Sequence, residues 1–153
     1  MSSYRSVKLH LLECNIDDMN PEFVPHVLQR LINAGVRDAW HTPIVMKQGR
    51  PGFCLSVLCD SEKREEVCGI IFLETSTLGI RSQTIERLEL DRQVHSVETK
   101  YGCARVKIAR DIAGVVLNIA PEYRPCKDLA EQHKVALNEV YQEVVRVWRE
   151  ENN

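Results

Sequence analysis

Three acidic side chains, Glu13, Asp17 and Asp18, lie within six residues of one another near the start of the chain. Carboxylates held this close together need a cation to balance them, and hard oxygen ligands suit Mg²⁺ or Mn²⁺. Alternation along a strand predicts that Glu13 and Asp17 share a face while Asp18 points away. The aspartates could instead cap the following helix, whose first amides lack partners. Both interpretations remain open at this point.

A second group of chemical interest is the turn from Thr42 to Gly52, which carries Lys47 and Arg50 beside two glycines. Glycine lets the backbone approach a ligand closely, and cations bind phosphate. A nucleotide polyphosphate would fit this turn, although basic residues in a hairpin turn can also be simply solvated. The chain contains neither Gly-x-x-x-x-Gly-Lys-Ser nor Gly-x-Gly-x-x-Gly, which excludes the standard nucleotide-binding motifs.

Three further segments carry weaker signals. The connection from Glu74 to Arg81 offers three hydroxyls, a glycine and an arginine, which suit phosphate or sugar oxygens or, alternatively, the end of a helix. Arg105 and Lys107 share one face of a predicted strand, a pattern that is also common on solvated strands. Pro121-Glu122-Tyr123 is either an ordinary turn or a carboxylate and a stacking ring beside a base.

The elements that must position these residues follow from hydrophobic periodicity and turn signals. In the first half we predict a strand at 7–16, a helix from Pro21 to Gly35, strands at 37–46 and 52–59, a helix from Ser61 to Leu73 and a strand at 80–90. Asn20 is the expected cap of the first helix, and Ser61 of the second. Pro25 predicts that the first helix begins a few residues late. The order favours a ferredoxin-like (βαββαβ) subdomain over residues 1–91, with an antiparallel sheet backed by two helices.

The second half follows another pattern, which predicts a small β-sheet subdomain with C-terminal helices over residues 92–153. We expect strands at 95–99, 104–109 and 115–119, then helices at 127–133 and 138–149. The join contains no flexible linker, which predicts that the two subdomains pack together. The fold class is therefore α+β.

Composition restricts the class of protein. Of 153 residues, 44% are apolar and 27% charged, and the formal net charge is −2, typical of a soluble globular protein without a global attraction for nucleic acid or membranes. No transmembrane segment or signal peptide is evident, so we expect a cytoplasmic protein. The six cysteines form no Cys-x-x-Cys pair and are interpreted as buried thiols, and the spacing of the five histidines predicts no preformed zinc site.

The residue patterns of these motifs, taken together and in their order along the chain, are more specific than any single motif. They resemble the LarC family of nickel insertion proteins over nearly the whole chain. The matching segments are Glu13-x-Asn15-Ile16-Asp17-Asp18-Met19-x-Pro21-Glu22, Thr42-Pro43-Ile44-x-Met46-Lys47-x-Gly49-Arg50-Pro51-Gly52, Glu74-Thr75-x-Thr77-Leu78-Gly79-x-Arg81, Tyr101-Gly102-x-x-x-Val106-Lys107 and Pro121-Glu122-Tyr123.

The resemblance implies the carboxy-terminal domain of a CTP- and divalent-metal-dependent cyclometallase. That family inserts Ni²⁺ into pyridinium bisthiocarboxylate mononucleotide, the precursor of the nickel-pincer cofactor of lactate racemase, and this domain binds CTP with Mg²⁺ or Mn²⁺. Transferred by position, the implied metal ligands are Glu13, Asp17 and Asp18. The implied phosphate contacts are Lys47, Arg50, Thr75, Thr77, Arg81 and Lys107, and the implied ribose or base contacts are Thr42, Glu122 and Tyr123.

The sequence departs from the family in two respects. The larger amino-terminal portion of the family has no counterpart here, so we expect nucleotide binding without the complete reaction unless a separate amino-terminal polypeptide supplies it. Arg124-Pro125 replaces the acidic residues that commonly follow Pro-Glu-Tyr. A non-catalytic nucleotide-binding oligomerisation or regulatory module is the alternative, and a homo-oligomer, trimer or hexamer, is expected in either case. RNA binding is disfavoured because the predicted strands lack aromatic residues.

Overall fold

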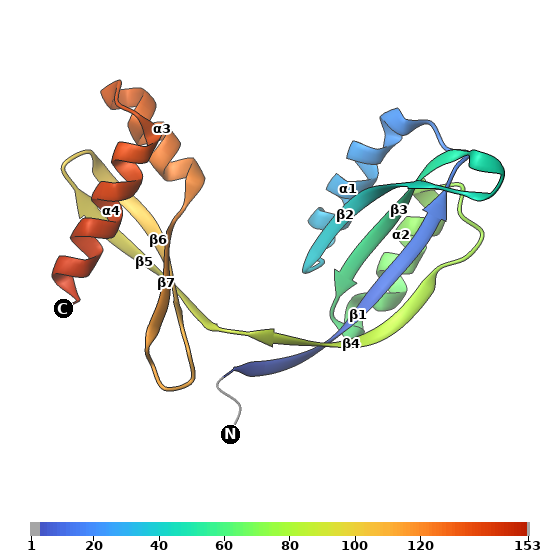
Figure 1. Ribbon diagram of the computed structural model, residues 1–153, viewed down its shortest axis with the longest axis horizontal. Helices are drawn as coiled ribbons and strands as arrows, with labels where there is room; N and C mark the ends of the chain where they lie inside the picture. Colours follow the sequence, from blue (N-terminus) through green and yellow to red (C-terminus); the bar gives the residue numbers. More distant parts are fainter. Residues whose placement is uncertain (1–3, 153) are drawn as a thin grey trace. The chain divides into compact units, whose positions relative to one another are not determined.

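The computed structural model describes residues 4–152, which form two compact units, one of Ser6–Arg87 and one of the chain from Leu88 onward together with Tyr4 and Arg5 (Figure 1). We call Ser6–Arg87 the amino-terminal unit and the chain from Leu88 onward the carboxy-terminal unit. Each contains one antiparallel sheet and two α-helices. The predicted α+β class is therefore confirmed.

The amino-terminal unit is a four-stranded sheet in the order β2-β3-β1-β4. Its strands are β1 (Arg5–Ile16), β2 (Asp38–Val45), β3 (Pro51–Cys59) and β4 (Arg81–Glu89). β3 pairs antiparallel with both β1 and β2, so it lies between them, as in a split βαβ unit. The finer ferredoxin-like assignment stays a prediction.

Helices α1 (Val24–Asn33) and α2 (Arg64–Glu74) cover one face of this sheet. Alternate residues of β1, namely Leu12, Cys14 and Ile16, share a core with Leu31 of α1 and Ile71 of α2. Because strand side chains alternate between faces, Glu13 and Asn15 lie on the opposite, open face. The hydrophobic pattern of β1 thus determines which side carries the polar groups.

Both helices begin with a short 3₁₀ turn. The side chain of Asn20 accepts a hydrogen bond from the backbone N–H of Glu22, which confirms the predicted cap, and Pro25 lies in the first turn of α1, which begins at Val24. The prediction for Ser61 was wrong, because Asp60 is the residue before the second 3₁₀ turn and no side chain caps it. The residue before a helical turn has extended backbone angles, and Asp60 has them, with φ −69° and ψ 155°.

The carboxy-terminal unit is a three-stranded sheet of β5 (Asp91–Thr99), β6 (Gly102–Arg110) and β7 (Val116–Pro121), followed by α3 (Tyr123–His133) and α4 (Leu137–Glu151). Val106 and Ile108 of β6 form a core with Cys126 of α3 and with Val144 and Trp148 of α4. β7 is an edge strand that pairs only with β6 among the described residues, and α4 packs across the sheet against β5, β6 and β7.

All six cysteines are free thiols, of which Cys14, Cys59 and Cys126 are buried and Cys103 is exposed. Burial raises the pKa of the Cys14 thiol, an effect that the side chain of Thr77 partly offsets. None of the helices in residues 4–152 is long and apolar enough to cross a membrane.

Candidate functional site

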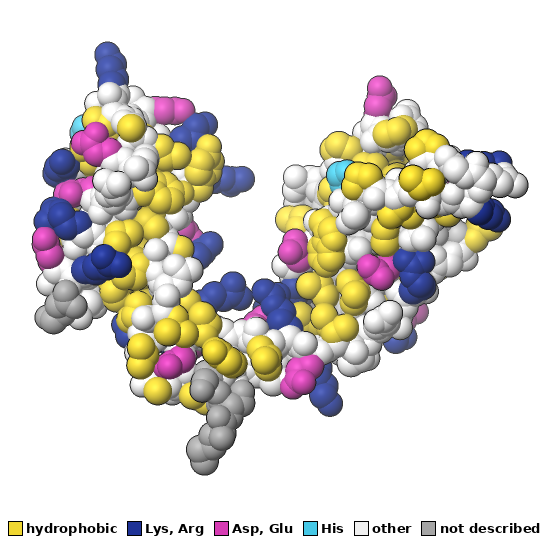
Figure 2. Space-filling model, viewed as in Figure 1, with side chains coloured by type: hydrophobic (Ala, Val, Ile, Leu, Met, Phe, Trp, Pro, Cys, Tyr) yellow, Lys and Arg dark blue, Asp and Glu magenta, His cyan; other side chains and the backbone are white. Residues whose placement is uncertain are grey.

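Three connections meet at one end of the amino-terminal sheet. The segment after β1, the turn between β2 and β3, and the connection from α2 to β4 all lie at this end because neighbouring strands are antiparallel (Figure 1). These are the acidic, basic and hydroxyl-rich segments of the sequence analysis. Figure 2 shows Lys and Arg side chains gathered at the tip of the β2–β3 turn. The fold therefore assembles the three segments, which we call the sheet-end loops.

A glycine allows two of these loops to approach closely. A Cβ atom on Gly52 would lie 2.6 Å from the carbonyl oxygen of Ile16 and 3.3 Å from Cβ of Asp17. The preceding turn also contains Gln48 at φ 63° and Gly49 at φ 70°, both left-handed. A hollow of ≈ 390 Å³ beside Asp17 is lined by Met19, Pro43 and Phe53 among others. Gly52 thus holds the basic turn against the end of β1.

The two aspartates contact different loops. An Asp17 carboxylate oxygen lies 3.7 Å from Nη1 of Arg50, and the Asp17 side chain is only 18% exposed. The Ser76 hydroxyl donates a hydrogen bond to Asp18. Neither aspartate caps the following helix, because Asn20 does so. The capping alternative for the acidic segment is therefore not what the structure shows.

On the open face, the Arg81 guanidinium is surrounded by acceptors. Its Nη2 lies 2.8 Å from Oδ1 of Asn15, 3.6 Å from Sγ of Cys54 and 4.0 Å from a carboxylate oxygen of Glu13. The other Glu13 oxygen accepts a hydrogen bond of 3.0 Å from the buried Ser56 hydroxyl. Glu13 thus anchors Arg81 in this structure, pointing onto the sheet face rather than toward the aspartates.

Sequence reasoning did not select Asn15, Cys54, Ser56 or Ser76 as site residues. Asn15 was visible in the acidic motif, and its spacing from Glu13 placed it on the same face. Cys54 and Ser56 are the register partners of Asn15 and Glu13 on β3. Their proximity depends on strand pairing, which the local sequence pattern does not encode.

The remaining candidates of this unit divide into two kinds. Thr75 donates its hydroxyl to the carbonyl of Ile71 at 2.7 Å, and the Thr77 hydroxyl donates to the carbonyl of Gly79 at 3.0 Å. These hydroxyls shape the loop after α2, as the helix-end alternative predicted. Thr42 and Lys47 are exposed, and Lys47 has no ion pair within residues 4–152. Lys47 is therefore available to an anion.

The carboxylates of the sheet-end loops fit a divalent ion only if a bound ligand supplies further oxygen donors. Within residues 4–152 no group of three or more His, Cys, Asp or Glu side chains is placed to hold a metal. Asp17 and Asp18 offer carboxylates in adjacent positions, and Mg²⁺ is commonly held by one or two carboxylates together with substrate phosphates and waters. The residues thus fit a metal–nucleotide complex better than a free ion.

The candidates Lys107, Glu122 and Tyr123 lie in the carboxy-terminal unit. One Glu122 carboxylate oxygen is 2.7 Å from Nε of Arg105, and the other is 3.4 Å from Nζ of Lys107. The hydrogen bond from Arg105 lowers the pKa of Glu122. Tyr123, at the start of α3, is 58% exposed. Glu122 and Tyr123 line a hollow of ≈ 440 Å³ together with Pro121 and Tyr141.

Comparison with known proteins gives a consistent result. The sequence model of the family described as "Nickel insertion protein" matches residues 1–141. The chain is 42% identical over 136 residues to the pyridinium-3,5-bisthiocarboxylic acid mononucleotide nickel insertion protein of Thermotoga petrophila, covering 89% of this chain and 34% of that protein. The protein of the same name from Acetivibrio thermocellus is 42% identical over 145 residues, covering 93% and 35%. The chain spans about a third of the length of these relatives.

Solved structures extend the likeness to the fold. LarC2, described as the C-terminal domain of a cyclometallase involved in the synthesis of the NPN cofactor of lactate racemase, superposes with a TM-score of 0.87 at 32% identity, covering 95% of this chain and 99% of LarC2. A protein from Methanopyrus kandleri superposes with a TM-score of 0.71 at 25% identity, covering 93% and 89%. The chain therefore belongs to the nickel insertion protein family, as the motifs at its sheet-end loops predicted.

Proposed function

We propose that this chain binds CTP together with Mg²⁺ or Mn²⁺, as the nucleotide-binding part of a nickel-inserting cyclometallase. One observation carries the proposal: the acidic segment contacts the basic and hydroxyl-rich segments through Asp17–Arg50 and Asp18–Ser76 at one end of a sheet, although Asp18 and Ser76 are 58 residues apart in sequence. The likeness to LarC2 and to curated nickel insertion proteins supports the choice of reaction class.

In this proposal Asp17 and Asp18 hold the divalent ion, with the nucleotide phosphates completing its coordination. The Asp17–Arg50 pair is long at 3.7 Å, and the Arg50 side chain is 59% exposed. Arg50 can therefore exchange its weak carboxylate contact for a phosphate at little cost. Lys47, exposed on the same turn, supplies a second cation.

Arg81 is the third phosphate contact, and Glu13 acts through it. A guanidinium has five N–H donors, and contacts with Asn15 and Glu13 use only Nη2 of Arg81. The remaining donors are free to receive phosphate oxygens in the fork geometry that arginine favours. Glu13 was expected to bind the metal directly; a positioning role for it agrees better with its contacts to Ser56 and Arg81.

The proposed nucleotide contacts of the carboxy-terminal unit form a set of their own. Glu122 offers carboxylate oxygens suited to ribose or amino groups, and the exposed Tyr123 ring offers a face for stacking. Lys107 shares Glu122 with Arg105, which reduces its net attraction for phosphate. We therefore assign Lys107 to orienting Glu122 as well as to phosphate binding.

The proposed chemistry is displacement of pyrophosphate from the α-phosphorus of CTP by the pincer precursor, which takes the cytidylyl group before nickel is inserted. When bound, the divalent ion offsets charge on the phosphate oxygens. The chain's own contribution is to fix the triphosphate with Lys47, Arg50 and Arg81 so that charge developing on the leaving pyrophosphate meets fixed cations. Nickel enters as substrate, not as a resident ion of this chain.

Calorimetry of the chain with CTP, ATP and GTP, each with Mn²⁺, tests the proposal. We expect CTP to bind more tightly than either purine nucleotide, and binding to weaken when the metal is chelated. Equal affinity for all three nucleotides would refute CTP recognition. Asp17→Asn should weaken metal-dependent CTP binding, and Asp128→Asn, at an exposed position of α3, is the control that removes a negative charge elsewhere.

A second candidate function is nucleotide binding without turnover, as in a regulatory or oligomerisation module. The same contacts support it, because holding a triphosphate with Lys47, Arg50 and Arg81 does not by itself require turnover. Pyrophosphate release distinguishes the two functions. Release on addition of CTP, precursor and Ni²⁺ supports turnover by this chain, whereas CTP binding without release supports the binding module.

A further inference from the structure

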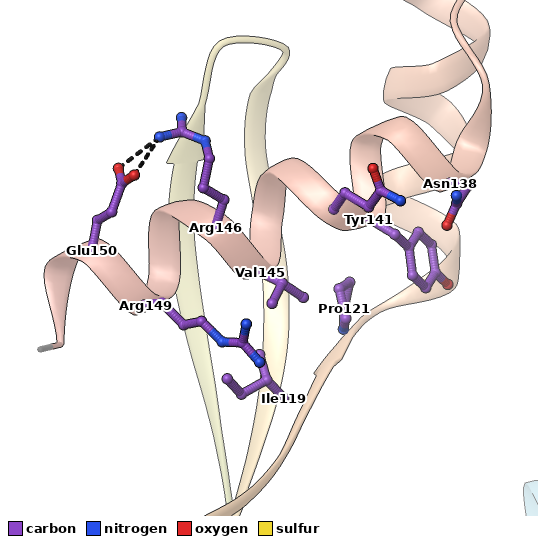
Figure 3. Close-up of a pocket in the computed structure, with 9 residues that line it drawn as sticks. Ile119, Pro121, Asn138, Tyr141, Val145, Arg146, Arg149 and Glu150 are labelled. Atoms are coloured by element: carbon purple, nitrogen blue, oxygen red, sulfur yellow. Dashed lines mark hydrogen bonds and ion pairs between the residues drawn. The ribbon is translucent and has the colours of Figure 1, made fainter.

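A groove of ≈ 620 Å³ runs between the edge strand β7 and helix α4, apart from the residues assigned to CTP and metal. Figure 3 shows Ile119 and Pro121 of β7 on one side, with Arg149 of α4 reaching toward Ile119. Its volume lies within the range of about 300–1,000 Å³ that is usual for small-molecule sites. The groove is therefore large enough for a nucleotide-sized ligand.

The walls of the groove suit a flat ring. Ile119 and Pro121 form an apolar wall on β7, opposite Tyr141 and Val145 of α4. The α4 residues that line it recur every three or four positions, from Asn138 to Arg149, which places them on one stripe of the helix. This stripe borders the core, because Tyr141 also packs against the cluster that contains Val140 and Val144.

The polar groups of the groove are mostly unused by the protein. Within residues 4–152, the side chains of Asn138, Gln142 and Arg149 have no hydrogen-bond or ion-pair partner. Arg146 differs, because it pairs with Glu143 at 2.8 Å and with Glu150 at 2.7 Å (Figure 3). One unpaired arginine and two side-chain amides therefore remain available to a ligand.

The charge of the groove limits the ligand. Glu143 and Glu150 neutralise Arg146, so Arg149 is the one cation of the lining that has no carboxylate partner within residues 4–152. This charge matches a single phosphate group but falls short of a triphosphate, which needs several cations or a metal. With the apolar wall and the tyrosine, the combination indicates an aromatic ring that carries one phosphate.

We propose that the β7–α4 groove binds an aromatic mononucleotide of the pyridinium type, with its phosphate on Arg149 and its ring between Tyr141 and the Ile119–Pro121 wall. The choice of a pyridinium ring rests on the proposed function, which makes such a mononucleotide the acceptor substrate. Pro121 and Tyr141 also line the hollow that contains Glu122 and Tyr123. The two sites are therefore contiguous within the carboxy-terminal unit.

Amide NMR titration of the whole ¹⁵N-labelled chain tests the proposal, with nicotinic acid mononucleotide as the probe because it contains the pyridinium ring, ribose and phosphate. We expect saturable shifts at Ile119, Val145 and Arg149. Arg149→Gln should weaken binding at least about tenfold, through loss of a charge-assisted phosphate contact. Lys127→Gln, at an exposed position of α3, should leave binding unchanged.

A second titration uses nicotinic acid riboside, which lacks the phosphate. It should bind at least about tenfold more weakly than the mononucleotide. Absence of shifts in the groove, equal binding of the riboside, or unchanged affinity in Arg149→Gln would each overturn the proposal. The titration contains no CTP, so its failure is distinguishable from failure of the proposed function, which the CTP calorimetry measures separately.

Discussion

The charged residues around the sheet-end loops are paired differently from the Glu122 and Arg146 clusters of the carboxy-terminal unit. In the amino-terminal unit, Arg50 lies 3.7 Å from Asp17 and Arg81 lies 4.0 Å from Glu13, and these partners come from separate loops and strands. In the carboxy-terminal unit, Arg105 lies 2.7 Å from Glu122, and Arg146 makes contacts of 2.7 and 2.8 Å with two glutamates. Charges at the sheet-end loops and on the neighbouring open face are thus loosely paired, and these carboxy-terminal clusters are tightly paired. Away from the sheet-end loops the amino-terminal unit also has a tight pair, Arg37 with Asp60 at 2.9 Å.

This difference indicates where a charged ligand exchanges with protein contacts. A long, exposed ion pair contributes little to stability, so a phosphate or a metal can replace it without destabilising the fold. A short hydrogen-bonded pair holds both side chains in place and orients them. We therefore expect substitutions in the sheet-end loops to change ligand binding with little effect on stability at low pH. Substitutions in the Glu122 and Arg146 clusters should change acid stability as well as the ligand contacts proposed there.

The largest effect is expected for Asp17→Asn. Removing a metal-binding carboxylate should lower CTP affinity about a hundredfold in Mn²⁺, at the upper end of the losses seen for groups that support a metal site. Without metal, the variant and the parent chain should bind CTP alike. Calorimetry with and without chelator checks both expectations, and an unchanged affinity would show that Asp17 is not a metal ligand.

The next effect is expected for Gly52→Ala. The added Cβ would lie 2.6 Å from a backbone oxygen, so the β2–β3 turn must move away from β1. Overpacking of this kind costs about 1–3 kcal/mol in the free energy of unfolding, and the move should also weaken CTP binding. Urea denaturation measures the first quantity. Gly79→Ala is the matched control, because a Cβ there meets nothing within 4 Å.

These two variants also show what could be predicted from the sequence. The elements followed from periodicity. The alternation of Val7, Leu9 and Leu11 predicted β1, although the structure buries Leu12, Cys14 and Ile16 together with Leu9. One face of α4 was predicted from Val140, Val144, Val147 and Trp148, and three of these are buried in its core. The meeting of the acidic and basic loops did not follow from local pattern, because it depends on the strand order. The requirement for glycine at position 52 arises from a carbonyl group on another strand.

A smaller effect is expected for Asn20→Ala, which removes the side chain that caps the turn before α1. Loss of such a cap costs about 1 kcal/mol of stability. Asn20→Asp should retain most of it, because aspartate is an equally good cap. Urea denaturation of the three proteins provides the measurement, and CTP affinity should stay constant throughout. A parallel loss of affinity would mean that helix capping and metal binding are not separate.

The smallest effect is expected on acid stability in the carboxy-terminal unit. Interaction with Arg105 lowers the pKa of Glu122 from 4.5, and interaction with Arg146 lowers that of Glu143. A lowered folded-state pKa stabilises the fold above the unfolded value, and this contribution is lost as pH falls below 4.5 toward the folded-state value. Glu122→Gln should therefore flatten the stability profile between about pH 5 and pH 3.

Chemical denaturation across this range checks the expectation, with Glu151→Gln at the exposed end of α4 as the control. A profile that stays as steep in Glu122→Gln as in the parent chain would contradict the assignment of the Arg105–Glu122 pair as a stabilising contact.

The candidate site was predicted less completely than the fold, for reasons visible in particular residues. Thr75 and Thr77 have the right chemistry for phosphate binding, yet their hydroxyls donate to carbonyl groups of their own loop. Ser76, between them, reaches Asp18 instead. Which of three adjacent hydroxyls points outward depends on how α2 ends, and residue type alone does not determine it.

Paramagnetic broadening by Mn²⁺ tests the central claim most directly, because the ion broadens only the amide signals near it. The ¹⁵N-labelled chain with CTP is titrated with Mn²⁺, and Mg²⁺ serves as the diamagnetic reference. We predict that the signals of Asp17, Asp18, Arg50 and Ser76 disappear first and that Asp17→Asn abolishes this pattern. Broadening centred on any other part of the chain, with these signals intact, would contradict the account.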